Sequence, residues 1–209
     1  MHSKLRMLHG VLLALAIAFC NAALSTAHAD DANAWSATQL MQALAQNKAS
    51  RVTFVEKKYI AALDRPLESS GELIYLPPDR LEKRTIKPKL ETLVIDKNTL
   101  TIERNGAKRS IALASYPEVA AFTESLRATL AGDLASLMRD YRVEVDGTRE
   151  QWRLVLLPSD PKIAAVLSRV LVTGKRARIE SIEILQADGN RSVMAIAPAA
   201  ALGASVPPR

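Results

Sequence analysis

Apolar and polar residues alternate along most of the chain after residue 50, in short runs that end at turn residues. The alternation predicts strands over 51–63, 71–76, 80–86, 90–96, 100–103, 110–113, 141–145, 152–156, 167–173, 179–185 and 192–197. Asn105-Gly106, Asp146-Gly147 and Asp188-Gly189 are strong signals for hairpin turns between such runs. Because connections this short join antiparallel neighbours, the pattern predicts a large, strongly curved antiparallel sheet of about eleven strands.

Two parts of the chain have helical spacing instead. Ser36 and Gln39 form a capping box in front of three apolar residues at helical spacing, which predicts a helix over 37–47. A second capping box, 115–118, precedes a longer helix that we expect to end at Gly132, and Asp133 is a candidate N-cap of a short successor. Residues 160–165 predict one more helical turn. The helices are the available cover for the apolar face of the sheet, so we expect a mainly β, α+β fold with an N-terminal helix and a mid-chain helical lid.

Residues 1–29 have the pattern of a secretory signal peptide. Lys4 and Arg6 precede an apolar run over 11–19, and a region of small and polar residues ends in Ala27-His28-Ala29. The apolar run is shorter than the roughly 20 residues that a bilayer span needs. We therefore expect cleavage after Ala29, a soluble protein in the periplasm and no stable membrane anchor. A retained anchor, or lipid attachment at Cys20, is the alternative.

Cleavage would remove every histidine and the single cysteine, because His2, His9, His28 and Cys20 all precede the cleavage site. The mature chain would then have no disulfide, no Cys/His zinc site and no Ser–His or Cys–His nucleophile pair. We accordingly expect no enzyme, no metal and no cofactor.

The composition of the remaining chain favours a single domain without a nucleic-acid partner. Of the 28 Lys and Arg residues two lie in the signal peptide, so 26 remain against 22 Asp and Glu, a net charge of +4. No Lys/Arg block resembles a nucleic-acid-binding arm. We expect one domain over 30–198 and a flexible C-terminal tail over 199–209.

The order and spacing of several segments resemble the LolA-type carriers of outer-membrane lipoproteins, and more closely a LolA-like branch. The resemblance covers about residues 43–196. Residues 52–57 stand where such proteins carry a Phe-x-Gln-x-Lys-like first strand, and residues 66–73 and 78–81 where they carry Gly-x-Leu followed by a proline. Residues 130–134 and 152–156 look typical of the LolA-like branch.

This resemblance implies a half-barrel closed by helices around a hydrophobic cavity that takes acyl chains. The implied function is a soluble periplasmic carrier that shelters the acyl chains of a lipoprotein or related lipid, such as a glycolipid or polyene lipid, on the way to the outer membrane. Inner- and outer-membrane transfer partners would follow. The alternative is a periplasmic sensor or adaptor that binds a protein or lipoprotein signal with the same half-barrel.

Alternation and helical spacing select the candidate lining of such a cavity, although ordinary core packing uses the same residue types. The candidates are Leu40, Met41, Leu44, Val52, Phe54, Leu73, Tyr75, Leu93, Ile95, Phe122, Leu126, Leu130, Met138, Trp152, Leu154, Leu156, Ile182, Ile184, Met194 and Ile196. LolA locks its lid with an arginine just before the proline of the second strand. Here Pro77 precedes Pro78, so the lid-locking candidate is Arg80.

Overall fold

The computed structural model describes residues 34–47 and 49–199 of the chain. The predicted signal peptide and residues 200–209 of the predicted tail lie outside the described residues, as does the side chain of Phe122.

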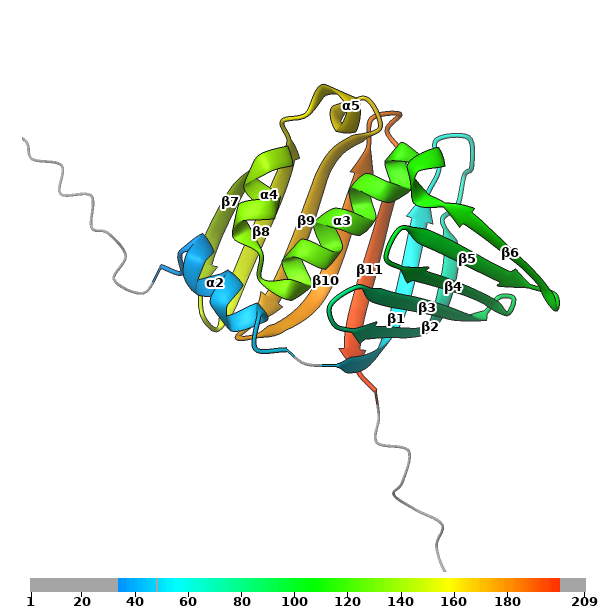
Figure 1. The fold of residues 1–209 in the computed structure, drawn as a ribbon, viewed down its shortest axis with the longest axis horizontal. Helices are drawn as coiled ribbons and strands as arrows, with labels where there is room; N and C mark the ends of the chain where they lie inside the picture. The colour runs from blue at the N-terminus through cyan, green and yellow to red at the C-terminus, as the bar shows by residue number, and fades with distance from the viewer. Residues whose placement is uncertain (1–33, 48, 200–209) are drawn as a thin grey trace, which may run out of the picture. The chain divides into compact units, whose positions relative to one another are not determined.

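The described part of the chain contains one open antiparallel sheet of eleven strands, which confirms the predicted mainly β fold (Figure 1). Strands that follow each other in sequence pair with each other, except β6 and β7, and the first strand also pairs with the last. The strands are β1 (Ser50–Tyr59), β2 (Leu67–Leu76), β3 (Arg80–Lys87), β4 (Glu91–Asp96), β5 (Thr99–Arg104), β6 (Ala107–Ala112), β7 (Tyr141–Thr148), β8 (Gln151–Pro158), β9 (Leu167–Lys175), β10 (Arg178–Gln186) and β11 (Arg191–Pro198).

The two edges of this sheet, β6 and β7, are consecutive in the chain. The segment between them contains the 3₁₀ helix η1 (Leu113–Ser115) and the helices α3 (Pro117–Ala131) and α4 (Leu134–Asp140). In Figure 1, α3 runs across the face of β9, β10 and β11, and α2 (Ala37–Leu44) lies with α4 over β7 and β8. The short helix α5 (Pro161–Ala164) joins β8 to β9. The helical insertion therefore connects the two edge strands and covers one face of the sheet.

Most of the predicted helix ends are confirmed. Ser36 caps α2 through the expected capping box, and Gly132 ends α3 in the left-handed conformation with a φ of 69°. Asp133 caps α4 by accepting a hydrogen bond from the backbone N–H of Ser136 at 2.9 Å. The predicted capping role of Ser115 is wrong, because Ser115 is the last residue of η1. The N-cap residue of α3 is Tyr116, and its side chain makes no capping hydrogen bond.

One predicted turn is displaced by three residues. Asp146-Gly147 does not form the turn between β7 and β8, since Gly147 pairs with Trp152 inside the hairpin and the turn follows Thr148. Gly147 has a φ of 95°, and a Cβ there would lie 2.3 Å from the carbonyl oxygen of Gln151. The glycine therefore allows close backbone pairing at the end of the hairpin.

A densely packed core lies between α2, α4 and strands β7–β10. Leu40 and Leu44 of α2 and Leu154 and Leu156 of β8 are fully buried in it. The indole of Trp152 is 1% exposed and donates a hydrogen bond from Nε1 to the carbonyl of Arg176 at 2.8 Å. This side of the sheet is a solid core with side chains of ordinary interior type.

We predict that Gly174→Ala destabilises the protein by about 2 kcal/mol or more. A Cβ at this position would lie 2.4 Å from Cζ2 of the Trp152 ring and 2.1 Å from the carbonyl oxygen of Arg178. The free energy of unfolding in urea measures the effect. Gly189→Ala is the control: its Cβ meets open space at a φ of 85°, so only backbone strain of about 1 kcal/mol should appear. Equal losses for the two variants would contradict the tight packing of Trp152.

Candidate functional site

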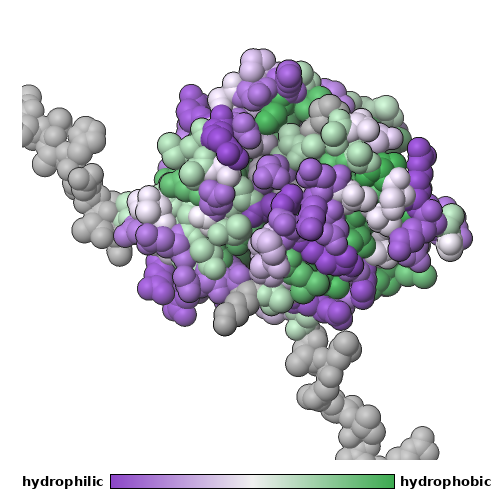
Figure 2. Space-filling model, viewed as in Figure 1, coloured by the Kyte–Doolittle hydropathy of each residue, from purple (hydrophilic) through white to green (hydrophobic). Residues whose placement is uncertain are grey.

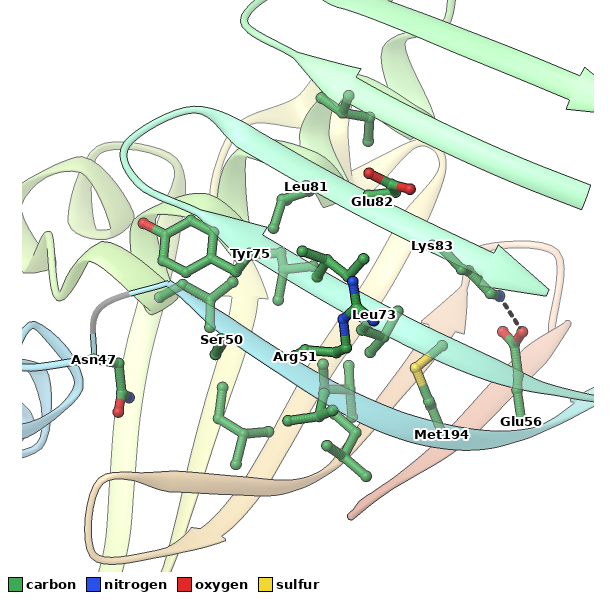
Figure 3. Close-up of a pocket in the computed structure, with 18 of the residues that line it drawn as sticks. Asn47, Ser50, Arg51, Glu56, Leu73, Tyr75, Leu81, Glu82, Lys83 and Met194 are labelled. Atoms are coloured by element: carbon green, nitrogen blue, oxygen red, sulfur yellow. Dashed lines mark hydrogen bonds and ion pairs between the residues drawn. The ribbon is translucent and has the colours of Figure 1, made fainter. Parts of the chain in front are cut away.

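A cavity of about 500 Å³ lies beside this core on the same face of the sheet, between β1–β5, β10, β11 and α3 (Figure 3). This volume lies within the range of about 300–1,000 Å³ that is typical of small-molecule sites. Its apolar lining residues are Val52, Leu73, Ile74, Tyr75, Leu81, Leu93, Ile95, Leu100, Leu126, Leu130, Ala177, Ile179, Ile182, Ile184, Met194, Ile196, Ala197 and Pro198. The composition of the wall suits a hydrocarbon ligand.

The strand register places most of these side chains on one face of the sheet. Val52 of β1 pairs with Leu73 of β2, and Lys83 of β3 stands opposite both Leu73 and Leu93 of β4. On the other side of β1, Ile182 of β10 pairs with Met194 of β11. Side chains alternate along a strand, so residues in register across neighbouring strands share a face. The lining is therefore continuous across the pairing of the first strand, β1, with the last strand, β11.

Helix α3 supplies the roof of the cavity through Thr123, Leu126 and Leu130. The close backbone contacts of α3 are mainly with the other helices rather than with the sheet. Small or hydroxyl-bearing residues are buried along it, among them Ala121, Ser125, Ala128 and Thr129. Side chains as small as these fill little of the space above an apolar sheet face. Figure 2 shows the outer surface of the molecule on the side of α3. Hydrophilic residues occupy the middle of this surface, and smaller hydrophobic areas flank them.

Eleven of the twenty candidate residues lie in the cavity wall, as predicted. They are Val52, Leu73, Tyr75, Leu93, Ile95, Leu126, Leu130, Ile182, Ile184, Met194 and Ile196. Their position follows from strand alternation and register. A ligand-binding role for them remains a prediction.

The side chain of Phe122 lies outside the described residues, and the structure places the remaining candidates outside the lining. Leu40, Met41, Leu44, Trp152, Leu154 and Leu156 belong to the solid core between α2 and β7–β9. Met138 is 63% exposed on the outer side of α4 and is not part of the lining. Helical spacing and strand alternation could not separate these positions from the lining residues, since all of them are apolar and periodic.

Phe54 faces the same side of the sheet as Val52 but is covered. Its ring is 2% exposed, and the Lys83 ammonium lies over the ring, 4.9 Å from its centroid. Phe54 stands opposite Gly71 on β2, where the backbone of β3 approaches so closely that a Cβ would lie 1.8 Å from the Arg84 carbonyl oxygen. An aromatic ring beside a strand glycine fills the missing side-chain volume. Phe54 therefore packs beneath the Lys83 ammonium and is not part of the lining.

That charged group is an ion pair between Glu56 of β1 and Lys83 of β3, which lies at one end of the lining (Figure 3). The Glu56 carboxylate also accepts hydrogen bonds from Ser192 Oγ at 2.5 Å and Ser69 Oγ at 3.2 Å. Burial raises the pKa of Glu56, but the attraction of Lys83 and the hydrogen bonds from Lys83, Ser192 and Ser69 hold the pKa below the ordinary value of 4.5. The carboxylate is therefore ionised in a largely apolar wall.

Glu56 and Lys83 were not among the residues predicted from the sequence to line the cavity. Glu56 shares the alternation of Val52 and Phe54, so the inward direction of its side chain could have been read from the strand pattern. Lys83 could not be found in this way, because its position opposite Leu73 depends on the β2–β3 register.

Helix α3 is tied to the sheet by Arg127 rather than by the predicted Arg80. Arg127 forms an ion pair with Asp79 in the β2–β3 turn and donates to the Lys97 carbonyl in the β4–β5 turn at 3.5 Å. Arg80 instead pairs with Asp96 at 3.3 Å and Glu82 at 3.6 Å, both on strands. The expectation for Arg80 is corrected. The arginine that connects the helical lid to the sheet is Arg127 of α3, and the carboxylate is that of Asp79 in the β2–β3 turn.

The chain belongs to the family of outer membrane lipoprotein carrier protein LolA-like proteins, whose family model matches residues 29–208. This match covers nearly the whole described fold and confirms the resemblance noted in the sequence.

Solved structures with a similar arrangement include a LolA superfamily protein from Nitrosomonas europaea, at 10% identity and a TM-score of 0.45, covering 78% of this chain and 92% of that one. Another is LprF from Mycobacterium bovis, at 11% identity and a TM-score of 0.36, covering 82% and 96%. Comparison with curated proteins found no match. None of the helices in the described ranges has the length and apolarity needed for a bilayer span.

We predict that Glu56 makes stability dependent on pH. Because the folded pKa lies below the unfolded one, the stabilisation is complete above about pH 4.5 and is lost as the pH falls through the folded pKa. Glu56→Gln should therefore be less stable than wild type near neutral pH, and the difference should shrink in acid. Urea unfolding across this range measures it. Glu68→Gln, which breaks an exposed pair with Lys57, should change stability little at either pH.

We also predict that Asp79→Asn loosens the lid. Loss of the ion pair with the largely buried Arg127 should raise amide hydrogen exchange in α3 about fivefold or more. Arg80→Gln is the matched control, since Arg80 contacts strand carboxylates and should leave α3 exchange unchanged. Faster α3 exchange in Arg80→Gln than in Asp79→Asn would restore Arg80 as the lock.

Proposed function

We propose that the protein is a soluble periplasmic carrier that shelters the acyl chains of a lipoprotein or related lipid and moves it towards the outer membrane. The observation that supports this most directly is the apolar cavity of about 500 Å³ beneath α3. Membership of the LolA-like family supports the same class of cargo. Partners at the inner and outer membranes would load and unload the carrier, and the predicted signal peptide would direct it to the periplasm.

The physical basis is the transfer of hydrocarbon out of water. Each buried CH₂ group stabilises a complex by about 0.8 kcal/mol, so a sheltered 16-carbon chain would gain roughly 10 kcal/mol. Such a gain must be reversible in a carrier. The roof is connected to the sheet by the ion pair of Arg127 with Asp79 and by a buried hydrogen bond from Tyr141 of β7 to the Ala121 carbonyl at 3.1 Å. Movement of α3 would break these few polar contacts and open the cavity.

The lining itself supports release as well as binding. Met194 and the leucines of the roof and wall can adopt several rotamers and repack around chains of different shape. No catalytic group is part of the proposal, and no group of His, Cys, Asp or Glu in the described ranges is arranged to hold a metal ion.

The test is displacement of a fluorescent fatty acid by a synthetic diacylated lipopeptide, with purified protein. Leu126→Gln should weaken binding at least tenfold, because it places an amide in the apolar roof. Met138→Gln is the matched control on the neighbouring helix and should bind like wild type, since Met138 is exposed. If wild type binds no acylated compound, the carrier function is wrong. Native mass spectrometry of protein isolated from its own cells would identify the cargo.

A further inference from the structure

The ion pair at one end of the cavity joins two opposite charges, so the pair has no net charge. The Glu56 carboxylate accepts three hydrogen bonds: Oε2 accepts from Lys83 and Ser69, and Oε1 accepts from Ser192. The Lys83 ammonium has three N–H groups, and in the described ranges its contacts are the Glu56 carboxylate and the Phe54 ring. Lys83 lines the cavity and retains hydrogen-bonding capacity that a ligand can use.

The pair is also held in place before any ligand arrives. Glu56 and Lys83 reach towards each other from β1 and β3, across β2, above the ring that fills the space beside Gly71. Strands β1, β2 and β3 fix both backbones, and Ser69 and Ser192 fix the carboxylate. In Figure 3 the pair lies at the opposite side of the pocket from Tyr75 and Asn47. A polar group placed so rigidly can discriminate between ligands.

We propose that Lys83 and Glu56 form a head-group subsite that selects acylated ligands with an uncharged ester, amide or hydroxyl group at this position. The inference rests on the carrier function proposed above. The oxygen of such a group accepts a hydrogen bond from the Lys83 ammonium. Acyl chains attached through an ester or amide linkage fit the subsite, whereas free fatty acids bind there less tightly.

The charge balance is the reason for this selectivity. A carboxylate or phosphate at the subsite would add an uncompensated negative charge next to Glu56 in a largely apolar wall, and the lost hydration of that charge opposes binding. A hydrocarbon end without polar atoms would instead desolvate the Lys83 N–H groups without giving them an acceptor. A neutral acceptor avoids both costs.

The experiment compares 1-lauroylglycerol with laurate as competitors of a fluorescent acyl probe. It is carried out below their micelle concentrations and at mildly alkaline pH, where the fatty acid is ionised. Wild type should bind 1-lauroylglycerol about tenfold more tightly than laurate. Glu56→Gln leaves Lys83 as a net positive charge and should shift the affinity ratio at least tenfold towards laurate.

Two further variants keep the result interpretable. Glu56→Gln combined with Lys83→Met removes both charges together, avoids a lone buried charge, and should bind both lauroyl ligands with a reduced preference. Glu91→Gln breaks the cross-strand ion pair with Arg104 outside the lining and should keep the wild-type ratio.

The outcomes separate the two proposals. If wild type and every variant bind both ligands with the same ratio, the carrier function stands and the subsite is overturned, which leaves the pair as a tie between strands. If wild type binds neither ligand nor the probe, the carrier function itself fails. A wild-type preference for laurate would also overturn the subsite.

Discussion

The structure depends on holding helix α3 above an apolar sheet face so that a cavity remains between the two. Described residues buried along α3 include Ala, Ser and Thr, and the close backbone contacts of this helix are mainly with other helices. Ala128 reaches the packed core, and the Ala121 carbonyl accepts a hydrogen bond from Tyr141 of β7 at 3.1 Å, so α3 is anchored at these points. Protein interiors normally leave few voids of this size, and the cavity is therefore the candidate site.

The same sheet provides both a rigid and a hollow half. Around Trp152 the strands β7–β10 pack against α2 and α4, with large apolar side chains almost fully buried. The part of the sheet formed by β1–β5, β10 and β11, the hollow half, borders a cavity of about 500 Å³. Arg127 connects α3 to the turns of the hollow half by charge rather than by packing, and such a connection can open at moderate cost.

Within the hollow half, the Glu56–Lys83 pair is a polar group that its neighbours hold in place. Gly71 lets the backbones approach, Phe54 fills the space beside the glycine, and Lys83 lies above Phe54 and pairs with Glu56. An ion pair in an apolar wall costs desolvation energy, which the hydrogen bonds from Ser69 and Ser192 partly offset. Pairs of this kind rarely add much stability, and this favours a role in recognition of the ligand.

Strand number, strand order along the chain and most helix ends were determined by the sequence alone, because side-chain alternation, capping residues and turn glycines act over a few neighbouring residues. Ser36, Gly132 and Asp133 are examples, and Gly147 shows the limit, since its φ was compatible with both a turn and a close backbone approach. Only the tertiary structure decided which apolar residues line a cavity and which fill the core. Leu126 and Leu154 follow equally regular patterns, but Leu126 lines the cavity at the edge of the core and Leu154 lies fully inside the core. The Arg127–Asp79 and Glu56–Lys83 pairs also required the fold, because each joins residues whose separation along the chain carries no local signal of contact.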